Sequence, residues 1–398
     1  MKKIAFIDYG HAGSLFPLMK RFLADGYEVD YFCPHSTCGM YLEASDLKFK
    51  SSKYGVEEVP SSCYPLLNSY FGSSALHIFS FRTPRPFESN KLLYCLAMLH
   101  RYKYFKECCD WINSRNYDLV NIIGRYYLTD IRMFCKLVKC KMAVSLHEVC
   151  NHNNPDFGHP SPLVRYLIRN KVNIVVYSKK SYDDIAKYEG IDMDNVKIIP
   201  FGKFETYKHL ANRSKLSLPS RYILFVGLIS PYKGLDVFYR ATSSLDDFGV
   251  KYFVAGAGES DCLDLMNNDD RYIVINKFLS VYEFTDLISR AEFIVCPYKS
   301  GSQSGIPMSC YVFNTPLIAS DIPSFRDVID DGEDGELFAS GDELALKAKL
   351  IKVLSAPEIL QKYRHNLERF ESGKKQFDWD NIFKQFKSVF IEITMKLK

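Results

Sequence analysis

The sequence lacks the features that mark membrane-spanning, fibrous and exported proteins. No apolar run reaches the roughly 18–20 residues that a bilayer-crossing helix requires, and the longest runs, Leu92–Leu99 and Tyr222–Ile229, have only the length of core segments. Glycine and proline number 21 and 17 of 398 residues, too few for collagen or a flexible low-complexity chain. The opening residues MKKIAFIDYG hold too short an apolar stretch for a signal peptide and predict a buried strand instead. We therefore expect a globular protein of the cytoplasm.

The sequence also lacks a recognisable metal or disulfide framework, although it contains 12 cysteines. No two of them form Cys-x-x-Cys, and the pairs Cys33/Cys38 and Cys135/Cys140 match no zinc module. A His-Glu-x-x-His zinc motif starting at His147 would need histidine at position 151, where asparagine stands. We expect reduced, mostly buried thiols and no bound metal.

The length and the order of the apolar segments predict an α/β protein of two domains. Ile4–Ile7 reads as a buried strand, a helical stripe follows from Leu15 to Leu23, and Glu28–Phe32 reads as the next strand. The alternation restarts near residue 222 after a polar segment, Lys203–Pro219, which we interpret as a hinge. Such βαβ rhythm favours two doubly wound parallel sheets facing a cleft, with ligands at the carboxyl ends of the strands.

The net charge of +4 conceals a local basic excess. Residues 82–141 hold more than twice as many basic as acidic residues, and within 82–106 the basic residues alternate with aromatic ones. This mixture suits an anionic membrane surface or a phosphate-bearing acceptor. It also suits a solvated helix face above a stripe of Leu and Met in the core, and the sequence leaves both open. No nucleic-acid recognition motif accompanies it.

Four segments join a predicted strand to a following element and therefore fall at the carboxyl ends of the sheets. Gly10–Gly13 opens the first helix but is not Gly-x-Gly-x-x-Gly, which argues against a nicotinamide dehydrogenase. His147 follows another strand. Lys233, in Pro231–Leu235, stands where a point charge neutralises a phosphate. Gly301–Pro307 offers small and neutral polar residues, and no Asp or Glu occurs from 293 to 320, which excludes paired-carboxylate glycoside hydrolysis from this segment.

Six stretches together resemble the retaining glycosyltransferases of family 4, in particular a bacterial branch that acts in exopolysaccharide, capsule and lipopolysaccharide synthesis. They are IPFG at 199–202, FVGLISPYKGLD at 225–236, VAGAGE at 254–259, QSGI at 303–306, PLIASD at 316–321 and DGEDG at 331–335. SLHE at 145–148 and FDWD at 377–380 extend the similarity over most of the chain. The resemblance implies the GT-B fold: a Rossmann-like acceptor-side domain over 1–203, a nucleotide-sugar domain over 204–376, and a terminal helix, 377–398, that crosses back to the first domain.

The resemblance also implies roles for individual residues. Lys233 matches the lysine that grips the donor diphosphate, and His147 the histidine beside the donor sugar; these are the expected catalytic residues. The remaining expected donor-binding residues are Gly13, Gly227, Gly256, Gly258, Lys277, Phe278, Leu279, Gln303, Ser304, Gly305, Ile306 and Ser309. Three positions depart from the family pattern. Leu228 replaces an arginine, Ser309 replaces the second of two glutamates, and the first glutamate is also missing from its expected place near Gly301–Gln303.

These features predict an enzyme that transfers a sugar, with retention and without a metal or other cofactor, from a nucleotide sugar to a glycan or lipid-linked acceptor. UDP is favoured over GDP as the nucleotide. The protein would act in the cytoplasm, with a peripheral contact to the inner face of an anionic membrane through 82–106 as a further expectation. The departures at Leu228 and Ser309 motivate one alternative, a non-catalytic GT-B subunit that binds nucleotide sugar or glycan and supports a partner transferase. A UDP-sugar epimerase on the same fold is disfavoured, since 297–320 supplies no acid.

Overall fold

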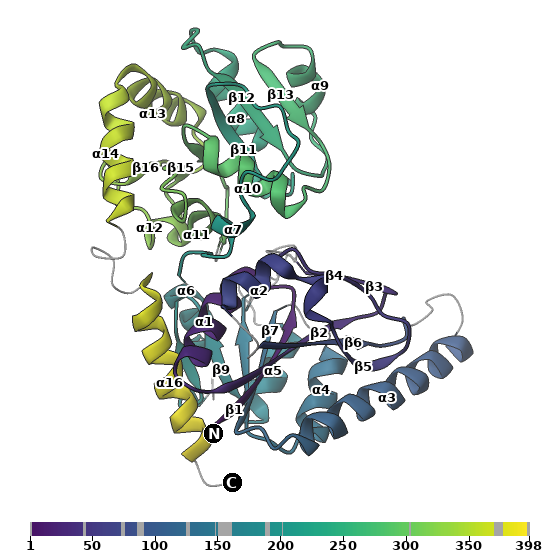
Figure 1. Ribbon diagram of the computed structural model, residues 1–398. Coiled ribbons are helices and arrows are strands. Elements are labelled where there is room, and N and C mark those ends of the chain that lie inside the picture. Colours follow the sequence, from purple (N-terminus) through teal and green to yellow (C-terminus); the bar gives the residue numbers. More distant parts are fainter. Residues whose placement is uncertain are drawn as a thin grey trace. The chain divides into compact units, whose positions relative to one another are not determined.

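The computed structural model describes residues 2–42, 45–72, 76–85, 91–124, 128–147, 149, 161–187, 192–200, 202–301, 304–369 and 377–395. The chain divides into two compact units (Figure 1). Unit 1 comprises Met1–Gly202 together with Trp379–Lys398, and unit 2 comprises Lys203–Asp378.

The sheet of unit 1 has the described strands in the order β10-β9-β8-β7-β1-β2-β6-β5. Neighbours are parallel except for β5, which is antiparallel to β6. The strands are β1 (Lys3–Tyr9), β2 (Glu28–His35), β5 (Gly55–Glu58), β6 (Leu76–Arg82), β7 (Leu119–Gly124), β8 (Met142–Leu146), β9 (Asn173–Val176) and β10 (Val196–Ile198). A separate antiparallel pair consists of β3 (Gly39–Tyr41) and β4 (Lys48–Lys50). Chain order reverses between β1 and β7, which makes their carboxyl ends the switch point where ligands bind in such sheets.

The sheet of unit 2 has the described strands in the order β13-β12-β11-β14-β15-β16, and all of them are parallel. They are β11 (Tyr222–Val226), β12 (Lys251–Ala255), β13 (Tyr272–Ile275), β14 (Ile294–Cys296), β15 (Leu317–Ser320) and β16 (Gly335–Phe338). This is the 3-2-1-4-5-6 order of dinucleotide-binding sheets. Its switch point lies between β11 and β14.

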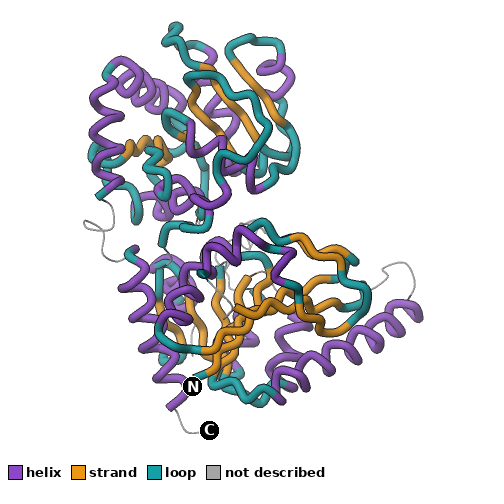
Figure 2. The backbone as a smooth tube through the Cα atoms, viewed as in Figure 1, coloured by secondary structure: helices purple, strands orange, loops and turns teal. Residues whose placement is uncertain are grey.

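Helices flank both sheets (Figure 2). In unit 1 they are α1 (Ala12–Ala24), η1 (Ser61–Cys63), α2 (Pro65–Phe71), α3 (Lys91–Ser114), α4 (Leu128–Leu137), α5 (Pro162–Arg169), α6 (Lys179–Ala186) and α16 (Trp379–Met395). In unit 2 they are α7 (Tyr207–Leu210), η2 (Pro231–Lys233), α8 (Leu235–Ser243), α9 (Cys262–Asn267), α10 (Val281–Arg290), α11 (Ile306–Tyr311), α12 (Pro323–Arg326), α13 (Glu343–Ser355) and α14 (Pro357–Glu368). Within the described segments, no helix has the length and apolar character needed to cross a membrane.

The strands that the sequence predicts at Ile4–Ile7 and Glu28–Phe32 form as β1 and β2, and most of their residues are buried. β7 and β11 are buried along their whole length, as expected of parallel strands covered by helices on both sides. The α/β class, the parallel sheets and the alternation of strands and helices are thus confirmed. Separate clusters of buried side chains fill unit 1 and unit 2, so each unit has a core of its own.

The last helix, α16, packs on unit 1 although it follows the whole of unit 2 in the chain. Its apolar stripe is buried, and the ring of Phe390 stacks on Phe22 of α1 with centroids 5.5 Å apart. Ion pairs border the contact: Lys387 binds Asp25 at 2.7 Å and Asp380 binds Arg21 at 3.4 Å.

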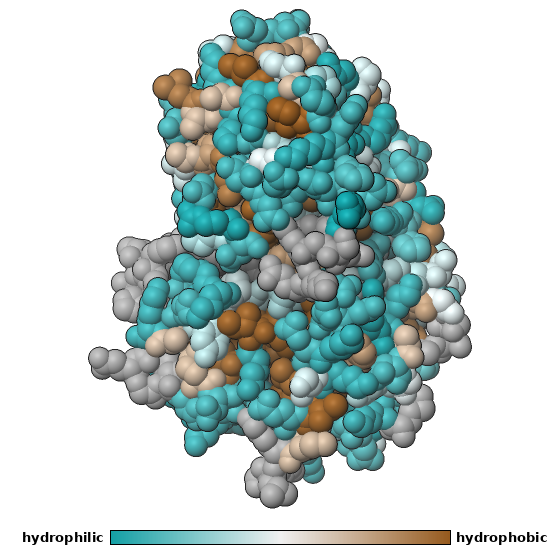
Figure 3. Space-filling model, turned by 90° about the vertical axis from the view of Figure 1, so that its left-hand side faces the viewer, coloured by the Kyte–Doolittle hydropathy of each residue, from teal (hydrophilic) through white to brown (hydrophobic). Residues whose placement is uncertain are grey.

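On the side shown in Figure 3 hydrophilic residues predominate, and brown hydrophobic groups gather mainly in unit 1, the lower half of the view.

The division between the units falls at Gly202/Lys203, at the start of the segment Lys203–Pro219 that we interpreted as a hinge. Within this segment the amides of Asn212 and Ser214 both donate to the carboxylate of Asp286 in unit 2. One of the two interpretations of residues 82–106 is wrong. The apolar residues at the start of α3 are not a core stripe, since Leu92, Leu96 and Leu99 are exposed. The described cysteines are free thiols, of which Cys38 and Cys95 are exposed and the others are buried or half-buried.

The packing of α16 yields a test of stability. Phe390→Ala should lower the free energy of unfolding of unit 1 by about 3–5 kcal/mol, because it removes a buried ring and leaves a cavity. Met395→Ala on the same helix should cost less than about 0.5 kcal/mol, because that side chain is 75% exposed. Urea unfolding followed by tryptophan fluorescence isolates unit 1, which holds both tryptophans, Trp111 and Trp379. Equal losses in the two variants would contradict the docking of this helix.

Candidate functional site

Close backbone contacts at the carboxyl ends of β11, β12 and β14 shape the switch point of unit 2. A Cβ atom added to Gly256 would lie 1.8 Å from the carbonyl oxygen of Gly227, and one added to Gly258 would lie 2.1 Å from that of Ile229. A Cβ on Gly234 would lie 1.9 Å from the carbonyl oxygen of Pro297, and Gly234 also has φ +70°. Only glycine permits these approaches. They bring the segment after β11 against the ends of its two neighbours.

Lys233 sits in the turn that these contacts create. Its ammonium lies 5.1 Å from the ring centroid of Tyr298 and would be 2.9 Å from a Cβ on Gly227. Burial lowers the pKa of Lys233, because a desolvated ammonium is less favourable than a hydrated one. In the part of the chain that the structure describes, no hydrogen bond or ion pair satisfies this ammonium. Lys299 differs, since it pairs with Asp236 at 2.9 Å.

The loop before α11 adds neutral groups to the same edge of the sheet. The Ser304 hydroxyl accepts from the amide of Ile306 at 3.3 Å. A side chain at Gly305 would meet the ring of Phe204 at 3.4 Å. The Ser309 hydroxyl donates to the carbonyl of Gly305 at 2.9 Å and is buried, so it is engaged with the helix backbone. Gln303, the remaining expected residue of this loop, lies outside the described residues.

In the segment after β13, Asn276, Ser280 and Glu283 hold the expected residues Lys277 and Phe278 in place, and the sequence did not point to these three. The Asn276 side chain bonds both ways with Gly258: its carbonyl oxygen accepts from the Gly258 amide at 3.1 Å, and its amide donates to the Gly258 carbonyl at 3.0 Å. Lys277 pairs with Glu283 at 2.7 Å, and Glu283 closes a capping box with Ser280 at the start of α10. The side chain of Phe278 is 84% exposed. An asparagine just after a strand is the signal that could have revealed Asn276.

In unit 1 the switch point is held by Asp8, another residue not singled out in the sequence. One carboxylate oxygen of Asp8 accepts from the amides of Gly10 and His11 at 2.8 and 2.7 Å, and the other accepts from the Tyr31 hydroxyl at 2.6 Å. The carboxylate is fully buried and fixes the turn that leads to Gly13 in the first turn of α1. Its place at the end of β1, before Gly10, is a signal that the sequence does contain.

His147 lies at the same switch point. Its ring stacks on that of His11 with centroids 3.5 Å apart and planes 11° apart, and it contacts Tyr177 at 4.7 Å. The side chains that follow β1, β8 and β9 therefore converge here. The structure brings His147 together with the Gly10–Gly13 turn, and His11 is the additional residue that the sequence analysis did not select.

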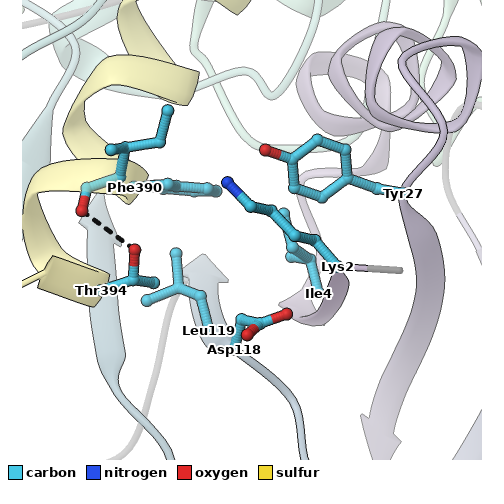
Figure 4. Close-up of a pocket in the computed structure, with 8 residues that line it drawn as sticks. Lys2, Ile4, Tyr27, Asp118, Leu119, Phe390 and Thr394 are labelled. Carbon is cyan, nitrogen blue, oxygen red and sulfur yellow. Dashed lines mark hydrogen bonds between the residues drawn. The ribbon is translucent and has the colours of Figure 1, made fainter.

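Two further features lie apart from these edges. A cavity of about 40 Å³ opens at the amino ends of β1 and β7, between Lys2, Asp118 and Phe390 (Figure 4). It is far smaller than a nucleotide sugar and lies at the opposite end of the strands from the Gly10–Gly13 turn. Among the described side chains, no group of three His, Cys, Asp or Glu residues is placed to hold a metal ion.

Comparisons with known proteins relate this geometry to a family. Residues 220–356 match the family model described as Glycosyl transferases group 1. The chain is 20% identical to the alpha-D-kanosaminyltransferase of Streptomyces kanamyceticus, over 53% of this chain and 58% of that protein. It is 22% identical to the O-antigen chain mannosyltransferase RfbU of Salmonella typhimurium, over 57% and 65%. The chain thus spans less than two thirds of these curated relatives.

Similarity of structure covers nearly the whole chain. Anabaena HepE, solved in complex with UDP-glucose, aligns with a TM-score of 0.66 over 98% of this chain and 100% of its own, at 12% identity. The fold is GT-B. The two doubly wound sheets correspond to the two Rossmann-like domains that the resemblance implied.

The glycine contacts in unit 2 can be tested by a matched pair of substitutions. Gly256→Ala should lower the melting temperature of unit 2 strongly, because the new methyl group would collide with the backbone of Gly227. Gly341→Ala carries the strain of a positive φ, +81°, but meets no atom within 4 Å, so it should cost only about 1–2 kcal/mol. Calorimetry of both variants gives the comparison. If the Gly256→Ala and Gly341→Ala variants have the same melting temperature, the close approach of Gly256 to Gly227 does not require glycine.

Proposed function

We propose that this GT-B protein is a glycosyltransferase that moves a sugar from a nucleotide sugar to a glycan or lipid-linked acceptor, with retention of configuration. The proposal rests on the match to group 1 glycosyltransferases, on the relatives that bear transferase names, and on the chemistry of unit 2. The name of RfbU refers to an O-antigen chain, and this supports a role in bacterial surface polysaccharide synthesis.

The observation that carries the proposal is the desolvated ammonium of Lys233 at the switch point. A partly buried charge without a counter-ion is unfavourable in a free protein. A bound diphosphate would supply the missing negative charge. The same edge provides close-approach backbone at Gly227, Gly256 and Gly258, where a phosphate chain can lie against amides instead of side chains.

In the proposed reaction the protein stabilises the charge of the leaving diphosphate and does not itself form a covalent bond to the sugar. The bond between the sugar C1 and the diphosphate oxygen breaks while the acceptor hydroxyl oxygen forms its bond to C1 on the same face, and the acceptor proton passes to the departing diphosphate. Lys233, with the amides of Ser304, Gly305 and Ile306, would stabilise the charge that grows on the diphosphate. His147 would lie beside the donor sugar, at the turn that contains Gly13.

The other expected donor contacts receive more specific assignments. Asn276 would hold the Gly258 backbone in place for the nucleotide, and Lys277, Phe278 and Leu279 would border it. Ser309 would act through the backbone of α11, to which its hydroxyl is bonded. We favour UDP as the nucleotide because HepE, which shares the fold, was solved with UDP-glucose. Because Leu228 stands where the family pattern has an arginine, Lys233 is the cation expected to meet the diphosphate. No metal is required in this scheme.

Replacement of Lys233 tests its role in UDP binding and, separately, its effect on the stability of the fold. Lys233→Met should keep or raise the melting temperature of the free protein, because it removes a desolvated charge. The stabilisation that UDP confers on the wild type should disappear, and transfer should fall about 100- to 1000-fold, the usual effect of losing one key donor. Thermal shift with UDP and a transfer assay measure the two effects.

Lys208→Met is the matched control, because Lys208 is an exposed lysine of unit 2, and it should retain both the UDP shift and transfer. Lys233→Arg should recover part of the UDP shift, since it keeps the charge. A Lys233→Met protein that is folded and still stabilised by UDP to the wild-type extent would refute the diphosphate assignment.

Removal of divalent metal ions tests whether the Lys233 ammonium, and not a metal ion, supplies the positive charge at the diphosphate. Dialysis against EDTA should leave transfer within about twofold of the untreated enzyme, because in this scheme a side chain supplies the positive charge that a divalent ion provides elsewhere. The untreated and Mg²⁺-restored enzymes serve as controls. Activity that is lost in EDTA and restored by a divalent ion would assign the role to a metal instead.

A further inference from the structure

Helix α3 has two halves with different surroundings. From Arg101 onward one face is buried in the core of unit 1, through Phe105, Cys108, Cys109 and Ile112. Before Arg101, the side chains described from Leu92 to His100 are exposed or half-exposed. Figure 1 shows this first half, the end of α3 next to the grey trace, reaching past the edge strand β5.

Three leucines line the outer side of this first half. Leu92, Leu96 and Leu99 are 69%, 53% and 67% exposed. They recur at i, i+4 and i+7, so they lie on one face of the helix, turned away from the face that carries Arg101 and Phe105. Leu93 and Tyr102 add exposed apolar surface on its two flanks, and Tyr94 is exposed on the opposite side of the helix. A continuous apolar face of this kind on a monomer marks an interaction surface.

The charge along the same stretch has one sign. Residues 91–106 contain no Asp or Glu, and Lys103 and Lys106 continue the leucine face toward the carboxyl end. Lys106 pairs with Asp110 at 2.6 Å, whereas the Lys103 ammonium lies 5.4 Å from the ring centroid of Tyr104 and forms no ion pair with a described residue. The leucines therefore have cations beside them, and the first acidic residue, Glu107, comes only after them.

The helix is held firmly where it leaves the core. The guanidinium of Arg101 binds both carboxylate oxygens of Asp130 on α4, at 2.9 and 2.7 Å, and donates to the Thr83 hydroxyl at 2.7 Å. Both partners of the ion pair are buried. This clamp ties α3 to α4 and to the segment after β6, so the exposed first half projects from a fixed base.

We propose that the first half of α3 docks on the surface of an anionic lipid membrane. The three leucines enter the boundary between headgroups and acyl chains, while Lys103 meets the lipid phosphates. The helix lies in the plane of the interface, since it is too polar beyond residue 102 to cross a bilayer. Charge of one sign beside the leucines favours this occupant over a second copy of the chain, whose α3 would bring the same cations together.

Vesicle sedimentation tests the surface without donor or acceptor. Wild-type protein should bind vesicles of phosphatidylcholine with phosphatidylglycerol and bind vesicles of phosphatidylcholine alone much more weakly. Leu92→Ser/Leu96→Ser/Leu99→Ser should weaken binding about tenfold or more, because it removes the inserted apolar area. Lys103→Glu should weaken it by a similar factor, since each basic charge near such a surface contributes about fivefold and the reversal changes two charges.

Matched controls come from unit 2. Leu265→Ser/Leu344→Ser replaces leucines that are 53% and 73% exposed, and Lys208→Glu reverses an exposed lysine; both should bind as the wild type does. Tryptophan fluorescence in urea should show unit 1 unchanged in the α3 variants. Stabilisation by UDP should also be unchanged in them, so this proposal and the proposed function can fail separately.

The remaining outcomes overturn the proposal. Wild-type protein that stays in the supernatant with both kinds of vesicle has no membrane-docking surface here. If it is also dimeric, and the triple leucine variant is monomeric, the face belongs to a second copy. Binding that survives the leucine substitutions assigns the contact to another surface, and binding that is insensitive to Lys103→Glu removes the requirement for anionic lipid.

Discussion

The switch point of unit 2 depends on a desolvated cation that its own unit does not neutralise among the described residues. Lys233 is brought there by η2, and η2 can approach β14 only because Gly234 has no side chain to meet Pro297. Gly227 and Gly256 are constrained by the same packing. The glycines and the lysine thus act together. The close approach of the backbone at the glycines leaves space for a ligand, and the positive charge of the Lys233 ammonium favours a ligand that is negatively charged. The energetic cost of this charge in the free protein is offset when an anion binds.

Two buried carboxylates elsewhere in the fold differ from Lys233, because each has partners of opposite charge. Glu336 on β16 is fully buried, but it contacts Lys349 and Lys352 of α13 and the hydroxyl of Tyr363 on α14, and these partners keep its pKa low although burial opposes this. Asp130 is buried against Arg101. Glu336 thus joins β16 to α13 and α14, and Asp130 joins α4 to α3. The charge of each of these carboxylates is already satisfied within the fold. The contrast with Lys233 is what singles out the switch point as a binding site.

The exposed leucines of α3 show why composition is a weak guide to burial. The run Leu92–Leu99 has the apolar content of a core helix, and a core stripe was one of the two interpretations it allowed. The buried face of α3 is instead made by Phe105, Cys108 and Ile112, one or more turns later. Leu92, Leu96 and Leu99 lie before this buried face begins and are exposed.

The sequence by itself determined the class of fold, the two doubly wound sheets and the segments that lie at their carboxyl ends. It could do so because buried parallel strands must be apolar throughout and the turns after them need glycine, features that are local in the chain. The resemblance carried by the sequence also implied that the terminal helix packs on the first domain and that the second domain begins near residue 204. Tertiary structure alone decided that His11 stacks on His147, that Asn276 holds Gly258, and that the Ser309 hydroxyl bonds to its own helix. These outcomes depend on contacts between residues far apart in the sequence, and on which surface each helix finds to cover, neither of which is encoded in any one segment.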